Sequence, residues 1–590
     1  MLKLFNNKYL KIIILYSLIT ITITYPLILK ANSHLFKGFV PSSYDIKQFT
    51  WEPVWNNVHP DVLGWVYVYA WNAHILTTNP RDYFNANMYY PNKNTLAYNS
   101  FSLTNGLIAM PINLIFHNSV LAYNFLIFFS YIMSAFAMYL LTNYFLKNEP
   151  IAFISGLMFI CTWFNYVRIQ DAIIISSEWI PLTLLYLFKF INEKKSKHIF
   201  LSLLFYLCQA LTEWYSAVFL AYTIGLCILT NIILNGREVI NLKNILLFFV
   251  VLILVFAILY PLAIPYFENK SQFLDFKRTK DDALWKAFYL DDYLIPKDKI
   301  KYIQYAFFIF LLFTPLKLKN LKTDIRQIKT AKYFFVILAL FSFIISLGPR
   351  LKAFSRVWNI PLPYSLLFDY APGFEITRDS RRFEILFILS MSFLTSLVIY
   401  ILTEKIKNIN LKRVSLAVFI IIPLINYTSI TDFSSMLQYV PSTNKEKIHK
   451  IYNWLGSLDK NVAIYQTTYT SNGFEKPGNS FREAVFTYYS TFHWKNTVNG
   501  LTWWIPPNYQ KLILMKKQFP SKDFLDELKK LKTDYIIIID CNGDVLDVKN
   551  GPLEELIKDG EIKLVKKFTG QKKLIYSYAY QIVYTNNIKS

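Results

Sequence analysis

The fold of this chain is decided by residues 383–427, which read FEILFILSMSFLTSLVIYILTEKIKNINLKRVSLAVFIIIPLINY. Two apolar runs, 383–403 and 412–428, are each close to the roughly 20 residues that a helix needs to cross a bilayer. The connection 404–413 between them carries Lys405, Lys407, Lys412 and Arg413. Because basic connections stay on the cytoplasmic side, this stretch predicts two membrane-spanning helices joined in the cytoplasm.

The same pattern recurs along the chain of 590 residues, of which 54% are hydrophobic and 17% are charged. This composition excludes a soluble enzyme. A mainly α-helical polytopic membrane protein with about 11–13 transmembrane helices is predicted, and whether 101–117 spans or is re-entrant stays open because it contains Gly106 and Pro111. The further apolar runs lie near 9–29, 119–146, 150–164, 172–192, 199–213, 214–235, 244–265, 302–316 and 333–348.

The positive charge follows membrane topology. The net charge is +23, but the basic residues gather in short connections between apolar runs and not in a nucleic-acid-binding patch. The connections 193–198, 317–332 and 404–413 are therefore expected in the cytoplasm, as is the N-terminus, with 9–29 kept as an uncleaved helix. It follows that the outer loops 31–100, 265–301 and 348–382, and everything after about residue 430, lie outside the cytoplasm.

Ionisable and aromatic residues concentrate in these outer loops, while the centres of the apolar runs are nearly free of ionisable groups. In 62–75 the apolar residues fit a helix that lies along the membrane surface. A transport path would place ionisable groups near the middle of the spans. The distribution therefore favours chemistry at the outer surface over transport through the bilayer.

The composition after residue 440 is that of a soluble domain. We expect a membrane domain at 1–435 and an extracytoplasmic α/β domain of about 150 residues at 440–590. The aromatic stretch 488–507 either exposes rings that stack on sugars or meet the membrane surface, or packs against the membrane domain. The expected helices are 445–455 and 522–531, the strands are 462–466, 535–540, 561–567 and 573–579, and a turn is expected at Asn542–Gly543.

Asp61 is the first candidate for chemistry. It follows His59-Pro60 and opens the helical segment that contains Trp65 and Trp71. A carboxylate there would accept a proton from an acceptor hydroxyl, as a general base does. The competing interpretation is a helix N-cap, for which aspartate is a preferred residue, and spacing alone favours the cap.

A second set of candidates binds substrate. Arginines in the outer loops are expected to bind a lipid phosphate, and carboxylates near the outer ends of spans are expected to orient a sugar. Internal ion pairs are the alternative for Arg168, and a membrane-interface anchor is the alternative for one of Arg381 and Arg382. The substrate-binding candidates are Arg168, Asp171, Glu178, Glu213, Arg278, Arg378 and Arg381.

Metal and nucleotide motifs do not occur in the sequence. The seven histidines form no HExxH spacing, and there is no GxxxxGK[ST], no GxGxxG after a strand and no GxSxG. The pairs Asp281-Asp282 and Asp291-Asp292 would suit a hard cation, but surface carboxylates that cap helices are commoner. We therefore expect no metal site and no cofactor, with a divalent cation left open.

The order of short motifs resembles the prokaryotic polytopic membrane proteins related to GT-C glycosyltransferases. The resemblance spans most of the chain, although each motif alone is unspecific. The matching stretches are 24–27, 61–72, 89–92, 105–107, 166–168, 178–181, 292–296, 347–350, 362–364, 372–374, 381–383 and 493–507.

The resemblance implies a GT-C-like fold and an enzyme that takes a sugar from a polyprenyl-phosphate donor at the outer membrane face. It implies that Asp61 is the base, with a glycan or lipid acceptor and membrane lipid as partners. Two departures from the pattern affect the site: Pro60 replaces the usual glycine before the aspartate, and Asp171 stands where a histidine is usual.

The sequence thus predicts an inverting, lipid-phosphate-dependent glycosyltransferase of the cell membrane. If Asp61 is not the base, Asp171 and Asp45 are the next candidates. Two non-enzymatic alternatives remain, a transporter or flippase and a scaffold that binds surface glycan through the aromatic stretch.

Overall fold

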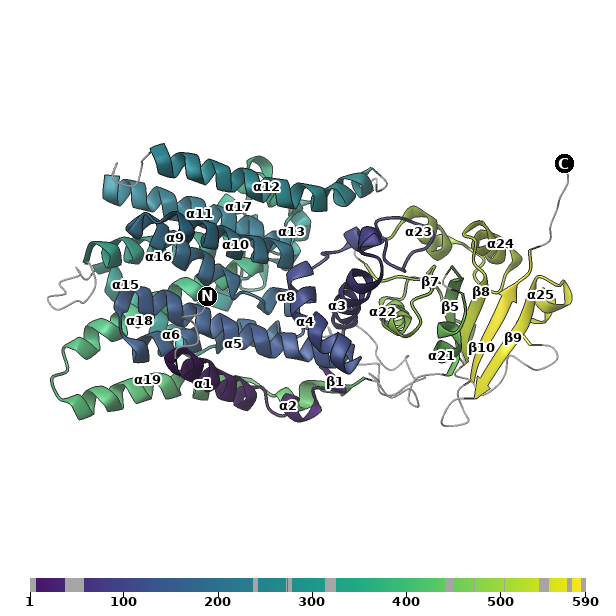
Figure 1. The fold of residues 1–590 in the computed structure, drawn as a ribbon, viewed down its shortest axis with the longest axis horizontal. Coiled ribbons are helices and arrows are strands. Elements are labelled where there is room, and N and C mark those ends of the chain that lie inside the picture. The colour runs from purple at the N-terminus through teal and green to yellow at the C-terminus, as the bar shows by residue number, and fades with distance from the viewer. Residues whose placement is uncertain are drawn as a thin grey trace. The chain divides into compact units, whose positions relative to one another are not determined.

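A computed structural model describes residues 7–37, 58–236, 242–271, 273, 278–313, 325–440, 450–459, 461–470, 473–502, 504–540, 551–569 and 576–584 (Figure 1). The chain forms two compact units. The first comprises Met1–Leu29, Leu126–Leu262 and Asp275–Ser435. The second comprises Lys30–Phe125, Ala263–Leu274 and Met436–Ser590.

Seven helices among the described residues are long and apolar enough to cross a membrane. They confirm the predicted mainly α-helical, polytopic class. They are Ser119–Leu146, Ala172–Glu193, Trp214–Asn235, Lys243–Lys270, Ile325–Ser346, Ser380–Glu404 and Ile409–Ser429, and shorter apolar helices lie at Leu103–Phe116, Glu149–Ile160 and Ile300–Leu312.

In the residues of the first unit that the structure describes, the strands form one hairpin and the other regular elements are helices. Its strands are β2 (Arg350–Ala353) and β3 (Arg356–Pro361). Its helices are α1 (Asn7–Ile23), α2 (Leu27–Lys30), α6 (Glu149–Ile160), α7 (Trp163–Val167), α8 (Ala172–Ile175), α9 (Trp179–Glu193), α10 (Ser196–Thr212), α11 (Trp214–Asn235), α13 (Lys280–Lys286), α14 (Leu290–Leu294), α15 (Ile300–Phe313), α16 (Ile325–Ser346), α17 (Pro363–Tyr370), α18 (Glu384–Glu404), α19 (Ile409–Ile430) and α20 (Phe433–Met436), with the larger parts of α5 (Ser119–Leu146) and α12 (Leu242–Lys270).

Helix α18 is the centre of this bundle. It is apolar on all sides, and nearly every side chain along it is buried against α6, α15 and α16. Helices α12 and α19 are similarly apolar but leave most of their side chains exposed. A helix that is apolar all round needs an apolar environment, so protein surrounds α18 while α12 and α19 are suited to face lipid.

One predicted span is broken. The apolar run 172–192 forms α8 and α9, with Ser176, Ser177 and Glu178 between them outside any α-helix. The backbone is enclosed by protein there, since Ser176 and Ser177 hydrogen-bond to serines of α5. Non-helical backbone at membrane depth is tolerated when protein shields it, as here.

The second unit combines Lys30–Phe125 and Ala263–Leu274 with the C-terminal region. Its helices are α3 (Pro60–Thr78), α4 (Leu103–Phe116), α21 (Lys450–Gly456), α22 (Ser480–Tyr489), α23 (Pro507–Leu514), α24 (Lys522–Lys530) and α25 (Glu554–Lys558). Its strands are β1 (His34–Phe36), β4 (Leu437–Tyr439), β5 (Ala463–Thr470), β6 (Gly473–Phe474), β7 (Asn496–Thr497), β8 (Tyr535–Asp540), β9 (Ile562–Thr569) and β10 (Tyr576–Ile582).

A mixed sheet is the core of this unit. Its strand order is β6-β5-β8-β10-β9, with β7 pairing to β5. β5 and β8 are parallel, and β10 is antiparallel to both β8 and β9. The predicted C-terminal helices and strands are confirmed within a few residues where the structure describes them. Residues 445–449 of the first predicted helix, 573–575 of the last predicted strand and the predicted turn Asn542–Gly543 lie outside the described residues. The central strand β8 is an unbroken apolar run, as a strand buried on both faces requires.

The aromatic stretch of the C-terminal region packs inside the second unit. Tyr488 and Tyr489 are fully buried, and Trp494 stacks on His74 of α3 with ring centroids 4.1 Å apart. Of the two alternatives for this stretch, exposed rings therefore do not apply to these two tyrosines. The same packing encloses α3, whose residues 62–75 are buried almost throughout. The prediction that this helix lies along the membrane surface is wrong, because α4 and α22 pack against it.

Candidate functional site

A network of ion pairs gathers predicted site residues in the first unit. Asp379 lies just before α18 and is 4% exposed. Its Oδ2 is 3.1 Å from a terminal nitrogen of Arg168, and its Oδ1 accepts a hydrogen bond of 3.0 Å from Nε of Arg381. Arg168 also lies 3.6 Å from the carboxylate of Asp171. The carboxylate of Asp379 therefore joins Arg381, its neighbour in sequence, to Arg168, which is 211 residues from Asp379.

Arg382 connects this network to the start of α11. Its guanidinium forms an ion pair with Glu213, which precedes α11, and lies 4.9 Å from the ring centroid of Tyr215. Glu213 also accepts a hydrogen bond from Ser216. Because Arg381 and Arg382 both point into ion pairs within the protein, neither is a simple membrane-interface anchor.

Three more cations approach the same residues. Arg278 and Arg378 interact electrostatically with the hydroxyl of Tyr215. Lys286, at the end of α13, interacts electrostatically with Asp379 and with the neighbouring arginines. Burial and these arginines lower the pKa of Lys286.

The cluster carries a positive net charge. Burial alone would raise the pKa of Asp379, but Arg168 and Arg381 outweigh that effect and hold the pKa below its usual range. Among the described residues, three arginines form ion pairs with three carboxylates here, and Arg278, Lys286 and Arg378 act electrostatically on members of the same network. Arginine forks bind phosphate in a bidentate manner, so an arginine-rich, net-positive cluster is suited to a phosphate-bearing ligand. The cationic cluster is defined as Arg168, Arg278, Lys286, Arg378, Arg381 and Arg382.

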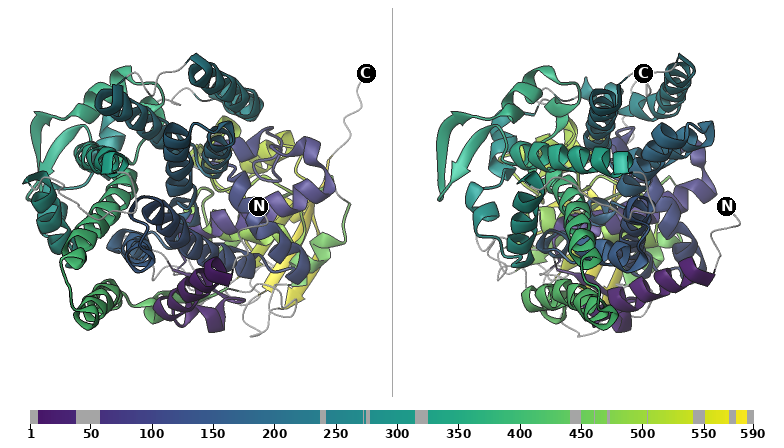
Figure 2. Two further views of the ribbon diagram at one scale, coloured as in Figure 1. Left: turned by 60° about the vertical axis from the view of Figure 1, so that its left-hand side comes forward. Right: turned by 90° about the vertical axis from the view of Figure 1, so that its left-hand side faces the viewer.

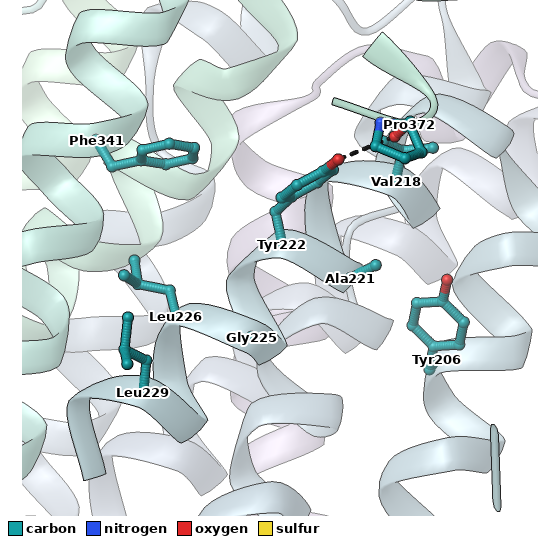
Figure 3. Close-up of a pocket in the computed structure, with 9 residues that line it drawn as sticks. All are labelled: Tyr206, Val218, Ala221, Tyr222, Gly225, Leu226, Leu229, Phe341 and Pro372. Atoms are coloured by element: carbon teal, nitrogen blue, oxygen red, sulfur yellow. Dashed lines mark hydrogen bonds between the residues drawn. The ribbon is translucent and has the colours of Figure 1, made fainter. Parts of the chain in front are cut away.

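An apolar cavity of about 540 Å³ lies along α11 (Figure 3). The hydroxyl of Tyr222 donates a hydrogen bond of 3.0 Å to the carbonyl of Pro372 at one side of it. Leu229 is 53% exposed, so the cavity reaches the surface of a membrane-spanning helix. Its lining residues are Tyr206, Val218, Ala221, Tyr222, Gly225, Leu226, Leu229, Phe341 and Pro372.

The cavity and the cationic cluster share α11. Tyr215, which contacts Arg278 and Arg382, lies three residues before Val218, which lines the cavity. Residues three apart lie on one face of a helix, about 4.5 Å apart along its axis. The charged cluster and the apolar cavity are therefore adjacent along one face of a span.

The structure does not bring every predicted residue together. Glu178 is fully buried between α8 and α9, where its Oε2 lies 3.5 Å from the hydroxyl of Ser134. Its Oε1 has no hydrogen-bond partner among the described residues. This enclosed position does not fit the predicted contact with a sugar. The other substrate-binding candidates lie in this network or interact with it electrostatically. They are Arg168, Asp171, Glu213, Arg278, Arg378 and Arg381.

Asp61 lies in the second unit, in the first turn of α3. The predicted N-cap role is wrong, because the cap is His59, whose Nδ1 accepts a hydrogen bond of 3.2 Å from the backbone nitrogen of Asp61. The carboxylate of Asp61 is 3.6 Å from the same imidazole, and its side chain is 38% exposed. It is accessible to a solvent-borne hydroxyl. Asp45, an alternative base, lies outside the described residues.

Sequence reasoning missed three contributors, namely Asp379, Lys286 and the pairing of Arg382. A signal for Asp379 was present, since residues 378–382 read RDSRR directly before an apolar run. An acid within such a run of arginines is suited to organise them. Lys286 had no comparable signal, because the charged groups that act on it, Asp379 and three arginines, are remote in sequence.

The paired aspartates serve as local structural groups. Asp282 and Asp292 accept backbone hydrogen bonds that cap α13 and α14. Asp281 pairs with Arg350, and Asp291 accepts a hydrogen bond from the backbone of Phe354. Across the part of the chain that the structure describes, no group of His, Cys, Asp and Glu is arranged to hold a metal ion.

Comparisons with known proteins give one kind of match. No known protein family and no curated protein matches the chain. Among solved structures, the chain is similar to ArnT from Cupriavidus metallidurans in the apo state. That likeness covers 96% of this chain and 97% of ArnT, with a TM-score of 0.48 and 9% sequence identity.

Proposed function

We propose that this protein is an inverting membrane glycosyltransferase that uses a polyprenyl-phosphate sugar as donor. The observation that carries the proposal is the adjacency of the cationic cluster and the apolar cavity on α11. A polyprenyl-phosphate has a matching construction, with an anionic head joined to a long apolar chain.

The phosphate head is assigned to the cationic cluster. Arg278, Arg378 and Arg381 would bind its oxygens, and the existing ion pairs to Asp379 and Glu213 hold the neighbouring guanidinium groups in place. Preorganised cations are effective where negative charge develops, because they need not reorganise during the reaction. Here that charge is the phosphate oxygen released when the bond to the sugar breaks.

The apolar chain is assigned to the cavity. Its lining is aliphatic and aromatic, and the exposed side of Leu229 opens it on a helix that can span the bilayer. A lipid would therefore enter from the side, without leaving the apolar phase. The cavity volume lies within the usual range of ligand sites, so it would hold a part of the chain nearest the phosphate.

The chemistry proposed for Asp61 is general-base catalysis. Its carboxylate takes the proton of the acceptor hydroxyl while the hydroxyl oxygen attacks C1 of the sugar. The bond between C1 and the phosphate oxygen breaks, and the lipid phosphate leaves from the opposite face, which inverts the configuration. Asp171 and Glu213 are proposed to orient sugar hydroxyls. In the proposed topology this reaction takes place outside the cytoplasm.

The test is sugar transfer by the purified protein in lipid nanodiscs, with a panel of polyprenyl-phosphate sugars. Wild type is expected to transfer or hydrolyse one donor, and Asp61→Asn is expected to lose that activity while keeping its fold. Asp82→Asn is the matched control, because Asp82 is an exposed carboxylate of the same outer loop. Activity in Asp61→Asn would move the base to Asp171 or Asp45.

A lipid flippase is the second candidate, and Glu178 favours it. A fully buried carboxylate among the serines of α5 and the α8–α9 break is a polar group at membrane depth. Such groups often mark translocation or proton paths. Donor binding with no transfer for any acceptor, together with lipid movement that Glu178→Gln abolishes, would favour this function over the transferase.

A further inference from the structure

The hairpin of β2 and β3 stands at the periphery of the first unit, as both views in Figure 2 show. It begins four residues after α16, a helix long and apolar enough to span the membrane. α16 exposes Tyr333, Ile337 and Leu340, which are spaced to form one stripe along the helix. The hairpin therefore continues directly from a helix with a lipid-facing side.

Strand β3 is exposed along its whole length. Side chains alternate between the two faces of a strand, so Trp358 and Ile360 point to one face and Val357 to the other. These three residues are 46%, 48% and 52% exposed. An edge strand with apolar residues on both faces would promote aggregation in water, so it requires an apolar or interfacial surrounding.

The tip of the hairpin carries Phe354, a bulky residue, at a backbone position with positive φ that disfavours bulky side chains. Ala353 pairs with Arg356, so Phe354 and Ser355 form a two-residue turn. Both have positive φ, 51° and 60°, for which asparagine and glycine are preferred. Phe354 is also 64% exposed. Because the residue is mostly exposed, packing inside the protein offsets little of the unfavourable backbone conformation.

The inner strand holds the hairpin in place. Lys352 donates hydrogen bonds to the carbonyls of Leu284 and Ala287, at 3.3 and 2.9 Å. The backbone nitrogen of Phe354 donates to Asp291 at 2.8 Å. These hydrogen bonds fix the position of the hairpin, so that β3 exposes its apolar side chains from a rigid support.

We propose that this hairpin is a membrane-interface anchor, with Phe354, Val357, Trp358 and Ile360 inserted at the boundary between lipid headgroups and acyl chains. Aromatic side chains concentrate at that boundary. Arg356, which is exposed between the tip and Trp358, would meet lipid phosphates. Through Lys352 and Asp291, the anchor fixes the height of the outer segment 281–295 above the bilayer. This role is independent of the reaction proposed above.

The test places a photocrosslinking residue, p-benzoylphenylalanine, at position 354 of the full-length protein in nanodiscs of phosphatidylcholine and phosphatidylglycerol. Irradiation should yield lipid adducts, identified by mass spectrometry, at several times the level obtained from the same residue at position 514. Leu514 is the control because it is 71% exposed and lies in the C-terminal region. Adducts to protein, or lipid adducts at the control level, would overturn the proposal.

A second variant separates anchoring from folding. Phe354→Asn suits the positive φ of the tip and should leave the fold intact in detergent. With p-benzoylphenylalanine at position 358, Phe354→Asn should reduce the yield of lipid adducts severalfold relative to the same probe beside Phe354. An unchanged yield would show that the tip does not hold the hairpin at the lipid surface, and would overturn its anchoring role.

Discussion

Replacing Asp379 by asparagine removes the negative charge that joins Arg168 and Arg381, while nearly preserving side-chain volume. Breaking a buried ion pair by removing one partner costs about 3–5 kcal/mol. The Arg168 and Arg381 side chains are 15% and 29% exposed, so water partly compensates both. The expected loss is therefore at the lower end, about 3 kcal/mol of the free energy of unfolding.

The same substitution should have the opposite effect on an anionic ligand. Asp379→Asn makes the cationic cluster more positive, so a polyprenyl phosphate should bind the variant more tightly than wild type. A ligand that binds only the folded state adds about 2.7 kcal/mol of stability at a hundredfold excess over its Kd. Saturating lipid should therefore restore most of the stability that the variant loses.

Reversible unfolding in mixed micelles of sodium dodecyl sulfate, with and without polyprenyl phosphate, measures both effects. Asp369→Asn is the matched control, since it breaks an exposed pair with Lys280 and should cost only about 0–1 kcal/mol. A variant as stable as wild type would refute the role of Asp379 as organiser of the arginines. A lipid effect no larger in the variant than in wild type would refute the assignment of phosphate to the cluster.

Three further substitutions test other parts of the structure. Burial and nearby arginines lower the pKa of Lys286, so its ammonium group loses its charge, and donor binding should weaken, as pH rises through that lowered pKa. The variant Lys286→Arg should keep binding to higher pH, as measured by titration with a fluorescent lipid phosphate. Burial raises the pKa of Glu483 from 4.5 to about 7. The protonated carboxyl therefore stabilises the fold fully below pH 4.5, and this stability is lost as pH rises through about 7. Glu483→Gln should flatten this trend in thermal unfolding between about pH 5 and 8, and an unchanged slope would contradict the assignment. A Cβ on Gly156 would collide with the hydroxyl of Tyr16 and lie 2.5 Å from the carbonyl oxygen of Ala135, so Gly156→Ala should lower the free energy of unfolding by about 1–3 kcal/mol. Gly225→Ala is the control, because a Cβ there would have no atom within 4 Å. Equal stability of the two variants would be inconsistent with this packing.

Local sequence signals predicted much of the fold. The strand 535–540 and the helix before it are correct because an apolar run and an amphipathic run each carry their own periodicity. The same signals failed for 62–75, and for 488–489 they did not decide between exposure and packing. There, aromatic residues that look interfacial are buried by elements remote in sequence. An apolar side chain does not reveal whether lipid or protein covers it.

The candidate site was predicted in part for the same reason. Charged residues beside apolar runs indicated Arg168, Glu213 and Arg381, and the structure places them in one network. Their partners were not predictable, since Asp379 contacts Arg168 across 211 residues of sequence. Glu178 was predicted near the outer end of a span, but it lies in the break between α8 and α9. Only the tertiary packing explains that break.

The hydrogen bonds of Asn87 determine how late during synthesis this part of the second unit can complete its fold. Its carbonyl accepts from the backbone and hydroxyl of Thr497, at 2.7 and 3.0 Å, across 410 residues of sequence. At a synthesis rate of roughly 5–20 residues per second, the partner strand emerges about 20–80 s after Asn87. During that interval the apolar faces of α3 have no cover from α22. A chain that terminates before residue 480 would lack α22 and remain in this state permanently, although all the candidate membrane spans among the described residues would be complete.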